Sequence, residues 1–190
     1  MSQINSSENG VNTRAEVLKG LAAGTIGGLV ASWVMEEFQY AWVKVSKRVK
    51  QSESGKSSSA SNREQSKKVK SEPATVKAAE IVSEKVFGHN LAKDEKKIAG
   101  NAVHYATGAT SGAIYGVAAE LAPTVTGGAG LGFGTAVWLV VDETAVPLFG
   151  LAKPPGEYPL STHIFALASH FVYGVSTEVV RYGLRQTILK

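Results

Sequence analysis

Cysteine is absent from this chain of 190 residues, so disulfide bonds and thiolate metal sites are excluded. The HExxH spacing that marks one class of zinc enzymes is absent as well. Residues 1–17 lack the basic start and cleavage site of a secretory leader, so we expect a polar tail there and a retained apolar segment after it. The redox compartment stays undetermined.

Charge is missing over four long stretches. They contain 16, 22, 21 and 20 residues without Asp, Glu, Lys or Arg: residues 20–35, 98–119, 121–141 and 158–177. A helix needs about 20 apolar residues to cross the hydrocarbon core of a bilayer. The sequence therefore predicts an all-α integral membrane four-helix bundle, with transmembrane helices at residues 18–43, 98–122, 125–149 and 160–185.

Glycine recurs at intervals of four residues in these stretches. The first two spans carry three such glycines each: Gly20, Gly24 and Gly28, then Gly108, Gly112 and Gly116. This spacing places the small residues on one helix face, where they let membrane helices approach closely. We expect GxxxG packing within the bundle, and a homo-oligomer or another membrane protein is a further partner that such faces fit.

Residues 44–97 form a polar insert that holds 14 of the 20 Lys and Arg residues. Beside a lipid bilayer, such a segment favours anionic lipid over nucleic acid as a partner, and a solvated charge run is the alternative. Residues 51–72 are rich in serine and should be disordered. Residues 74–87 have apolar positions at helical spacing, which predicts an amphipathic helix at the membrane interface or docked on the bundle. Residues 150–159 form a proline-rich loop.

The two halves of the chain share short motifs. Trp33 precedes a pair of acids, and Trp138 does so with one extra residue between. In the second and fourth spans, His104 and His170 are each followed by an aromatic residue and, four positions on, by a glycine. One interpretation is a pair of tandem helical hairpins related by an axis along the membrane normal.

Topology brings most of the polar residues of the spans to one side of the membrane. The candidates for an ion or proton pathway are Glu36, Glu37, His104, Asp142, Glu143 and His170. Ionisable groups at membrane depth are costly and therefore mark functional sites by default. Pro147 removes a helical hydrogen bond near this cluster. His163 is expected at a loop end, and Glu120 is expected to be solvated.

Three uses of the cluster remain open. Carboxylates and imidazoles can pass protons or ions, they can bind a divalent metal, and they can hold helices together without further chemistry. No catalytic residue is indicated, no cofactor is required, and a metal-dependent membrane enzyme ranks third after proton or ion handling and a non-catalytic packing or partner-binding module. Glu178 and Arg181 have the spacing of a local ion pair.

Two longer motifs resemble a known family. These are LFGLAKPPGEYPL followed by SHFVYGVSTEVVRYGLR in the last third, and VHYATGATSGAIYGVAAELAP before them. The chain resembles the YagU-like family of uncharacterised bacterial inner-membrane proteins over residues 101–185. Residues of this pattern include His170, Glu178, Arg181 and Arg185. The resemblance implies a multi-pass location in the inner membrane rather than a mechanism, and orientation stays open.

Overall fold

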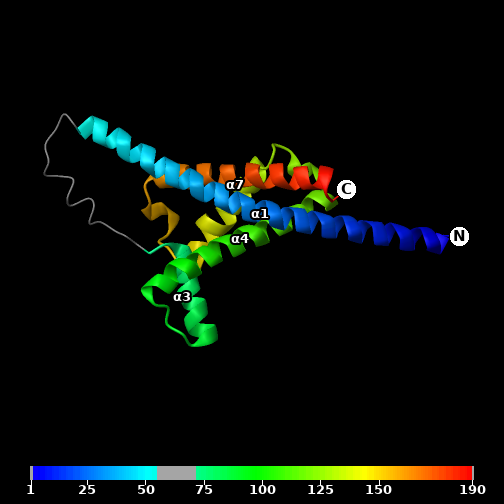
Figure 1. Ribbon diagram of the computed structural model, residues 1–190, viewed down its shortest axis with the longest axis horizontal. Coiled ribbons are helices and arrows are strands. Elements are labelled where there is room, and N and C mark those ends of the chain that lie inside the picture. The colour runs from blue at the N-terminus through cyan, green and yellow to red at the C-terminus, as the bar shows by residue number, and fades with distance from the viewer. Residues whose placement is uncertain (1, 55–71, 190) are drawn as a thin grey trace.

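The computed structural model describes residues 2–54 and 72–189 (Figure 1). Within these two ranges the chain is helical and has no strand. This agrees with the all-α class expected from the sequence. The predicted disorder of residues 51–72 is wrong at its start, because residues 51–54 continue the first helix. Residues 55–71 lie outside the described part.

Helix α1, Ser2–Ser54, is the longest element and lies between two others. Its 53 residues extend over roughly 80 Å at 1.5 Å per residue. Helices α4, Lys93–Leu121, and α7, Leu160–Thr187, both pack against it (Figure 1). Helix α1 extends past the span expected at 18–43 at both ends, α4 begins before the span expected at 98–122, and α7 ends after the span expected at 160–185. Their polar flanking residues are compatible with helix and continue the backbone hydrogen bonding.

The segment expected as one helix at 125–149 begins later, at Leu131, and continues to Leu148 with a π-helical section inside it. A 3-10 turn, η1 at Pro123–Thr126, is followed by α5 at Leu131–Val137, the π-helix η2 at Trp138–Ala145, and α6 at Val146–Leu148. Residues 128–130 all have positive φ angles, so the helix cannot begin before they end. A further 3-10 turn, η3 at Pro155–Glu157, interrupts the proline-rich loop.

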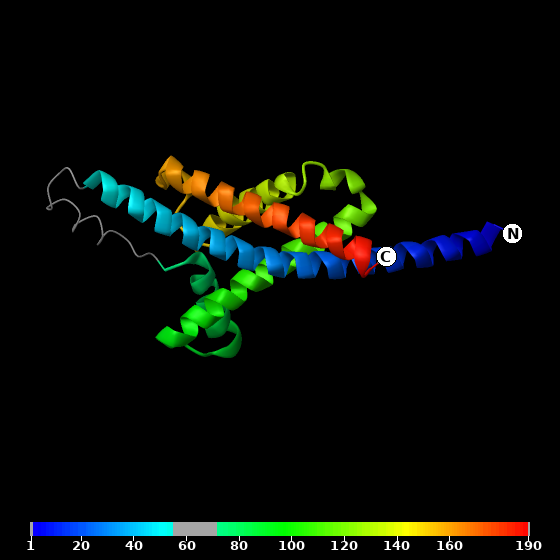
Figure 2. The same ribbon diagram turned by 45° about the horizontal axis from the view of Figure 1, so that its top comes forward.

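Glycines set the closest approaches between helices. A Cβ atom placed on Gly24 of α1 would lie 2.1 Å from the carbonyl oxygen of Gly112 on α4. A Cβ atom placed on Gly174 of α7 would lie 2.2 Å from the carbonyl oxygen of Gly130, just before α5. No real side chain fits at such distances, so the backbones themselves form the α1–α4 and α5–α7 contacts (Figure 2).

Helix α3, Ala74–Phe87, lies against the first part of α4 and outside the other helices (Figure 1). Val76, Ala79 and Ser83 are its buried residues. Lys96 of α4 pairs with Glu80 and, at 3.2 Å, with Glu72. The helix has the bounds given by the apolar pattern, and it is docked on α4.

Two helical segments are long and apolar enough to cross a membrane, by length and composition. They are Thr13–Val49 within α1 and Leu131–Leu148 across α5, η2 and α6. In the second segment only 6% is buried inside the protein. Leu139, Val140 and Leu148 are exposed in this segment, whereas Phe133 and Val137 pack against the buried core.

Candidate functional site

A cavity of about 400 Å³ opens between the helices at the end of the molecule where α4 and α7 begin. Its polar lining comes from α1, α3, α4, η2 and α7, and helix α3 also contributes small apolar side chains. The polar residues on its wall are Ser32, Gln39, Thr75, His104, Thr107, Ser111, Asp142, His170 and Tyr173. Asp142 is the one acidic residue among the described residues that line it.

Asp142 and His170 form the centre of this wall. His170 is buried, and its Nδ1 lies 2.9 Å from the carbonyl oxygen of Ala166. A carbonyl only accepts, so Nδ1 carries the proton and Nε2 is the acceptor nitrogen of the neutral ring. The Asp142 Oδ2 lies 3.7 Å from Nδ1, too far for a hydrogen bond. The Asp142 side chain is 40% exposed and therefore accessible from the cavity.

His104 and Tyr173 complete the wall. The His104 Nε2 lies 3.4 Å from the carbonyl oxygen of Ser32, which connects α4 to α1. The Tyr173 hydroxyl donates a 2.6 Å hydrogen bond to the carbonyl oxygen of Gly108. This bond holds α7 to α4 at the buried end of the cavity.

The π-helix η2 presents Asp142 to the cavity. In a π-helix each hydrogen bond spans five residues rather than four, and the Val146 N–H bonds the carbonyl of Val141 accordingly. Pro147 has no N–H, and its ring would crowd the carbonyl of Glu143 in a regular α-helix. The wider turn relieves that crowding. Short π-helical segments occur frequently at functional sites.

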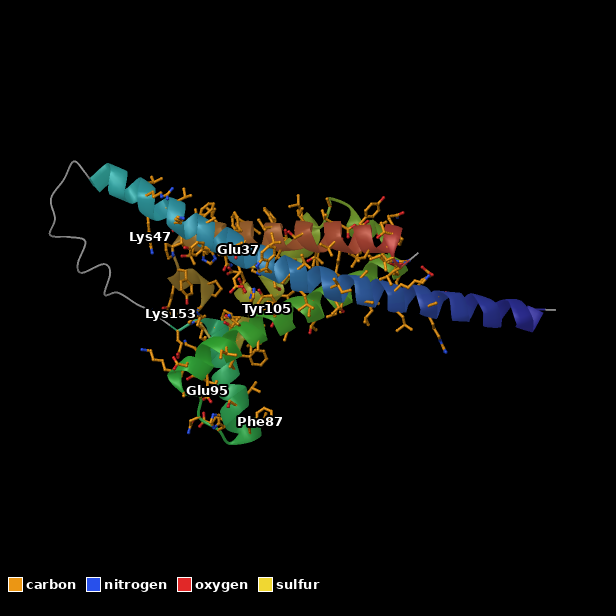
Figure 3. All side chains as sticks on the ribbon, in the orientation of Figure 1. Glu37, Lys47, Phe87, Glu95, Tyr105 and Lys153 are labelled. Carbon is orange, nitrogen blue, oxygen red and sulfur yellow. The ribbon has the colours of Figure 1, made fainter. Side chains whose placement is uncertain are left out.

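The other acidic candidates are placed elsewhere. Glu36 accepts a 2.9 Å hydrogen bond from Tyr105, and Glu37 is exposed; Figure 3 marks Glu37 on α1 and Tyr105 on α4. Glu143 pairs with His163 at 2.8 Å. Of the six predicted pathway residues, the structure thus brings together His104, Asp142 and His170. In the part of the chain that the structure describes, no group of three or more His, Asp or Glu is arranged to hold a metal ion.

A second polar cluster, the charged network, lies at the opposite end of the helices. It contains three acids and two arginines from α1, α4 and α7: Glu16, Glu120, Glu178, Arg181 and Arg185. Arg181 donates two hydrogen bonds to Glu178, at 2.7 and 2.8 Å, and both side chains are buried. Arg185 donates to Glu120 at 2.8 and 3.1 Å and pairs with Glu16.

This network corrects one expectation and extends another. Glu120 is not simply solvated, because it accepts two hydrogen bonds from Arg185 and lies 3.7 Å from Arg181. The expected local pair of Glu178 and Arg181 is present, yet it belongs to a cluster of five residues. Glu16 had no sequence signal, since it is 169 positions from its partner Arg185.

Three aromatic rings separate the cavity from the charged network. Phe133 stacks on Tyr115 with ring centroids 4.2 Å apart, and its centroid is 5.7 Å from that of Tyr173. The guanidinium of Arg181 lies 5.9 Å from the Tyr115 ring centroid. The Tyr115 hydroxyl is buried and has no hydrogen-bond partner in the described ranges. The family resemblance pointed to Tyr115, whereas the sequence pattern did not single out Phe133 or Tyr173.

Fold and cavity together define an all-helical protein with an acid–histidine wall between its helices. The sequence profile described as "Protein of unknown function (DUF1440)" matches residues 83–179, about half of the chain. The chain therefore belongs to the DUF1440 family, which confirms the expected membership of an uncharacterised family. The matched region includes His104, Asp142 and His170, and it ends before Arg181. Neither a curated protein nor a solved structure matches the chain.

Proposed function

We propose that this protein is a multi-pass bacterial inner-membrane protein in which four helical segments form two tandem hairpins. The outward apolar residues support this proposal. Ile114 on α4, Val140 on η2 and Val179 on α7 are each more than half exposed. Soluble monomers rarely expose large contiguous apolar surface, whereas a bilayer covers it without cost.

The glycine contacts support the same proposal. One hairpin, α1 with α4, and the other, α5 with α7, each meet through glycines at backbone distance. Membrane helices associate through such close contacts because the hydrophobic effect does not drive apolar helices together inside lipid. GxxxG packing therefore accounts for glycines that would weaken the same helices in water by about 1 kcal/mol each relative to alanine.

Within this bundle, we propose that the cavity handles protons or small cations. The observation that carries the proposal is the meeting of Asp142, His170 and His104, from three different elements, on the wall of one cavity. Imidazole titrates near neutral pH, and a carboxylate accepts protons or holds a cation. The acceptor Nε2 of His170 and the exposed carboxylate of Asp142 supply two sites for a proton within one wall.

A flux assay on reconstituted protein tests this function. Proteoliposomes containing a pH-sensitive dye should show proton flux across an imposed gradient, and Asp142→Asn and His170→Gln should each reduce its rate about tenfold, equivalent to about 1.4 kcal/mol. Asp94→Asn makes the same chemical change at an exposed site in the first turn of α4 and should leave the rate unchanged. Equal rates for all variants, with folding verified by circular dichroism, would contradict the proposal.

A second candidate is a non-catalytic membrane module that binds a partner through α3. Val86 and Phe87 are exposed there, Ile98 is exposed on α4, and lysines neighbour them in the sequence. Apolar side chains flanked by lysine suit the headgroup region of an anionic bilayer. A fluorophore attached to Phe87→Cys, the one cysteine of that variant, should then be quenched by brominated anionic lipid and less by brominated zwitterionic lipid. Equal quenching by the two lipids would argue against this candidate.

A further inference from the structure

We propose that the cavity binds a small organic cation with an apolar body, and that this cation exchanges with protons at Asp142. The proposal rests on the function proposed above and names the class of ligand at the same site. Three properties of the cavity lead to it: its volume, its apolar lining and its single negative charge.

The volume is too large for protons or a bare ion alone. A water molecule takes about 30 Å³ of liquid, so about 400 Å³ holds roughly a dozen waters or a molecule with a similar number of non-hydrogen atoms. This lies in the range of about 300 to 1,000 Å³ that small-molecule sites occupy. A metal ion would leave most of that space to water.

Apolar side chains make up much of the lining. Met35 of α1, Val103 of α4, Val141 of η2 and Phe149 after α6 all line the cavity. Burial of an apolar surface against such side chains contributes about 25 cal/mol per Å². A ligand with an apolar body therefore gains from this wall, whereas a fully hydrated ion gains nothing from it.

The charge of the wall selects a cation. Asp142 is faced by His104 from α4 and His170 from α7, and its neighbour Glu143 is paired with His163. The described residues of α1 and α3 that line the cavity carry no ionisable group. With the imidazoles neutral and Asp142 ionised, the wall carries a single negative charge. Protons added to Asp142 or the imidazoles remove that charge or reverse it, so protons and a cation compete.

The cavity also has a closed end. Tyr173 closes it against Gly108, and Phe133 and Tyr115 stack behind Tyr173. The opposite side is bordered by small residues of α3, including Ala74 and Ala78. The cavity therefore lies between α3 and Tyr173.

Binding of radiolabelled benzyltrimethylammonium to the purified full chain in detergent tests the proposal. This quaternary cation cannot lose a proton, and its neutral carbon analogue, neopentylbenzene, has the same shape. We expect saturable binding at pH 8, weaker binding at pH 5.5, and at least a tenfold rise in Kd for Asp142→Asn. Asp94→Asn should bind as the wild type does, and unlabelled neopentylbenzene should compete poorly.

A second variant guards against misfolding of the first. Ala78→Phe places a large ring on the cavity wall without changing its charge, and it should also abolish saturable binding. Binding that Asp142→Asn leaves unchanged, or equal competition by neopentylbenzene, would overturn the cation site.

The proposed function can fail separately. Proton flux without any saturable binding of the cation would overturn the ligand class and leave proton handling in place. Binding that depends on Asp142, in a protein that passes no protons in liposomes, would support the cation site and contradict proton handling.

Discussion

The charged network and the cavity wall each contain a carboxylate beside a basic side chain, but the hydrogen bonding of that carboxylate differs between them. In the network, the side chains of Arg181 and Glu178 are 8% and 11% exposed, and two hydrogen bonds of 2.7 and 2.8 Å join them. On the cavity wall, Asp142 is 40% exposed and 3.7 Å from His170. Paired, buried groups fix a structure, whereas an accessible carboxylate without a close partner remains available to a ligand. Burial and hydrogen bonding, rather than residue type, therefore distinguish a pair that stabilises the fold from a group that is available to a ligand.

The largest effect is expected in the network. Arg181→Met leaves the buried Glu178 carboxylate without its bidentate partner, which should lower the free energy of unfolding by about 3–5 kcal/mol. Unfolding in detergent, followed by circular dichroism, measures this loss. The double variant Arg181→Met with Glu178→Leu should recover most of it, because no unpaired charge remains. A small loss in the single variant would show that this pair, like the groups of the cavity wall, does not stabilise the fold.

A smaller effect is expected at the glycine contact between α1 and α4. Gly112→Ala would bring a Cβ atom within 2.3 Å of the Gly24 carbonyl oxygen, so α1 and α4 must separate, at a cost of about 2–3 kcal/mol. Gly132→Ala is the matched control, since no described atom lies within 4 Å of a Cβ there. It should stabilise α5 by about 0.5–1 kcal/mol. Equal effects of the two substitutions would refute close backbone contact.

Tyr173→Phe tests the hydrogen bond at the closed end of the cavity. It removes the 2.6 Å hydrogen bond to the Gly108 carbonyl and should lower the free energy of unfolding by about 1 kcal/mol. Thermal unfolding of the two proteins in the same detergent would show the difference. An unchanged unfolding temperature would mean that this bond does not hold α7 to α4.

Asp142→Asn is expected to separate stability from function. Its carboxylate has no close hydrogen-bonded cation, so the free energy of unfolding should change by less than about 1 kcal/mol while proton flux falls about tenfold. Paired unfolding and flux measurements on one preparation test this. A loss of stability as large as that of Arg181→Met would show that Asp142 stabilises the fold as the Arg181–Glu178 pair does.

The smallest effect concerns the attachment of α3 to α4 at extremes of pH. The hydrogen bond from the Ala92 N–H, and then His89, lowers the pKa of Glu95 below 4.5, so its contribution is present above that value and is lost as pH falls through the lowered pKa. Glu80, and then Glu72, raise the pKa of Lys96 above 10.5, so its contribution is present below that value and is lost as pH rises through the raised pKa.

A spin label at Val82→Cys measures this attachment, because the chain has no other cysteine. The label should be least mobile between these two limits and more mobile beyond each. Lys96→Met should remove the change at alkaline pH and keep the change at acid pH. Mobility that does not depend on pH would show that apolar contacts alone hold α3.

The all-α class, the family and the shared wall of Asp142 and His170 could be inferred from the sequence. Alternation of span direction places Asp142 and His170 on one side, whatever the details of packing. The sequence could not show that the neighbouring Glu143 pairs with His163 and does not line the cavity, because the direction of its side chain depends on the geometry of the π-helix. The role of Glu16 could not be predicted for another reason. Its contact with Arg185 joins segments near the two ends of the chain, and it forms only when these segments meet in the fold.

The π-helix has a consequence for how the two hairpins diverged, under the proposed correspondence of α1 with the segment of η2. One more residue separates Trp138 from Asp142 than separates Trp33 from Glu36. A π-helical turn absorbs one additional residue without ending the helix. Glu36 of the first hairpin contacts Tyr105, whereas Asp142, one residue further from its tryptophan, lines the cavity. Under this correspondence, a difference of one residue in spacing accompanies the different surroundings of the two acids.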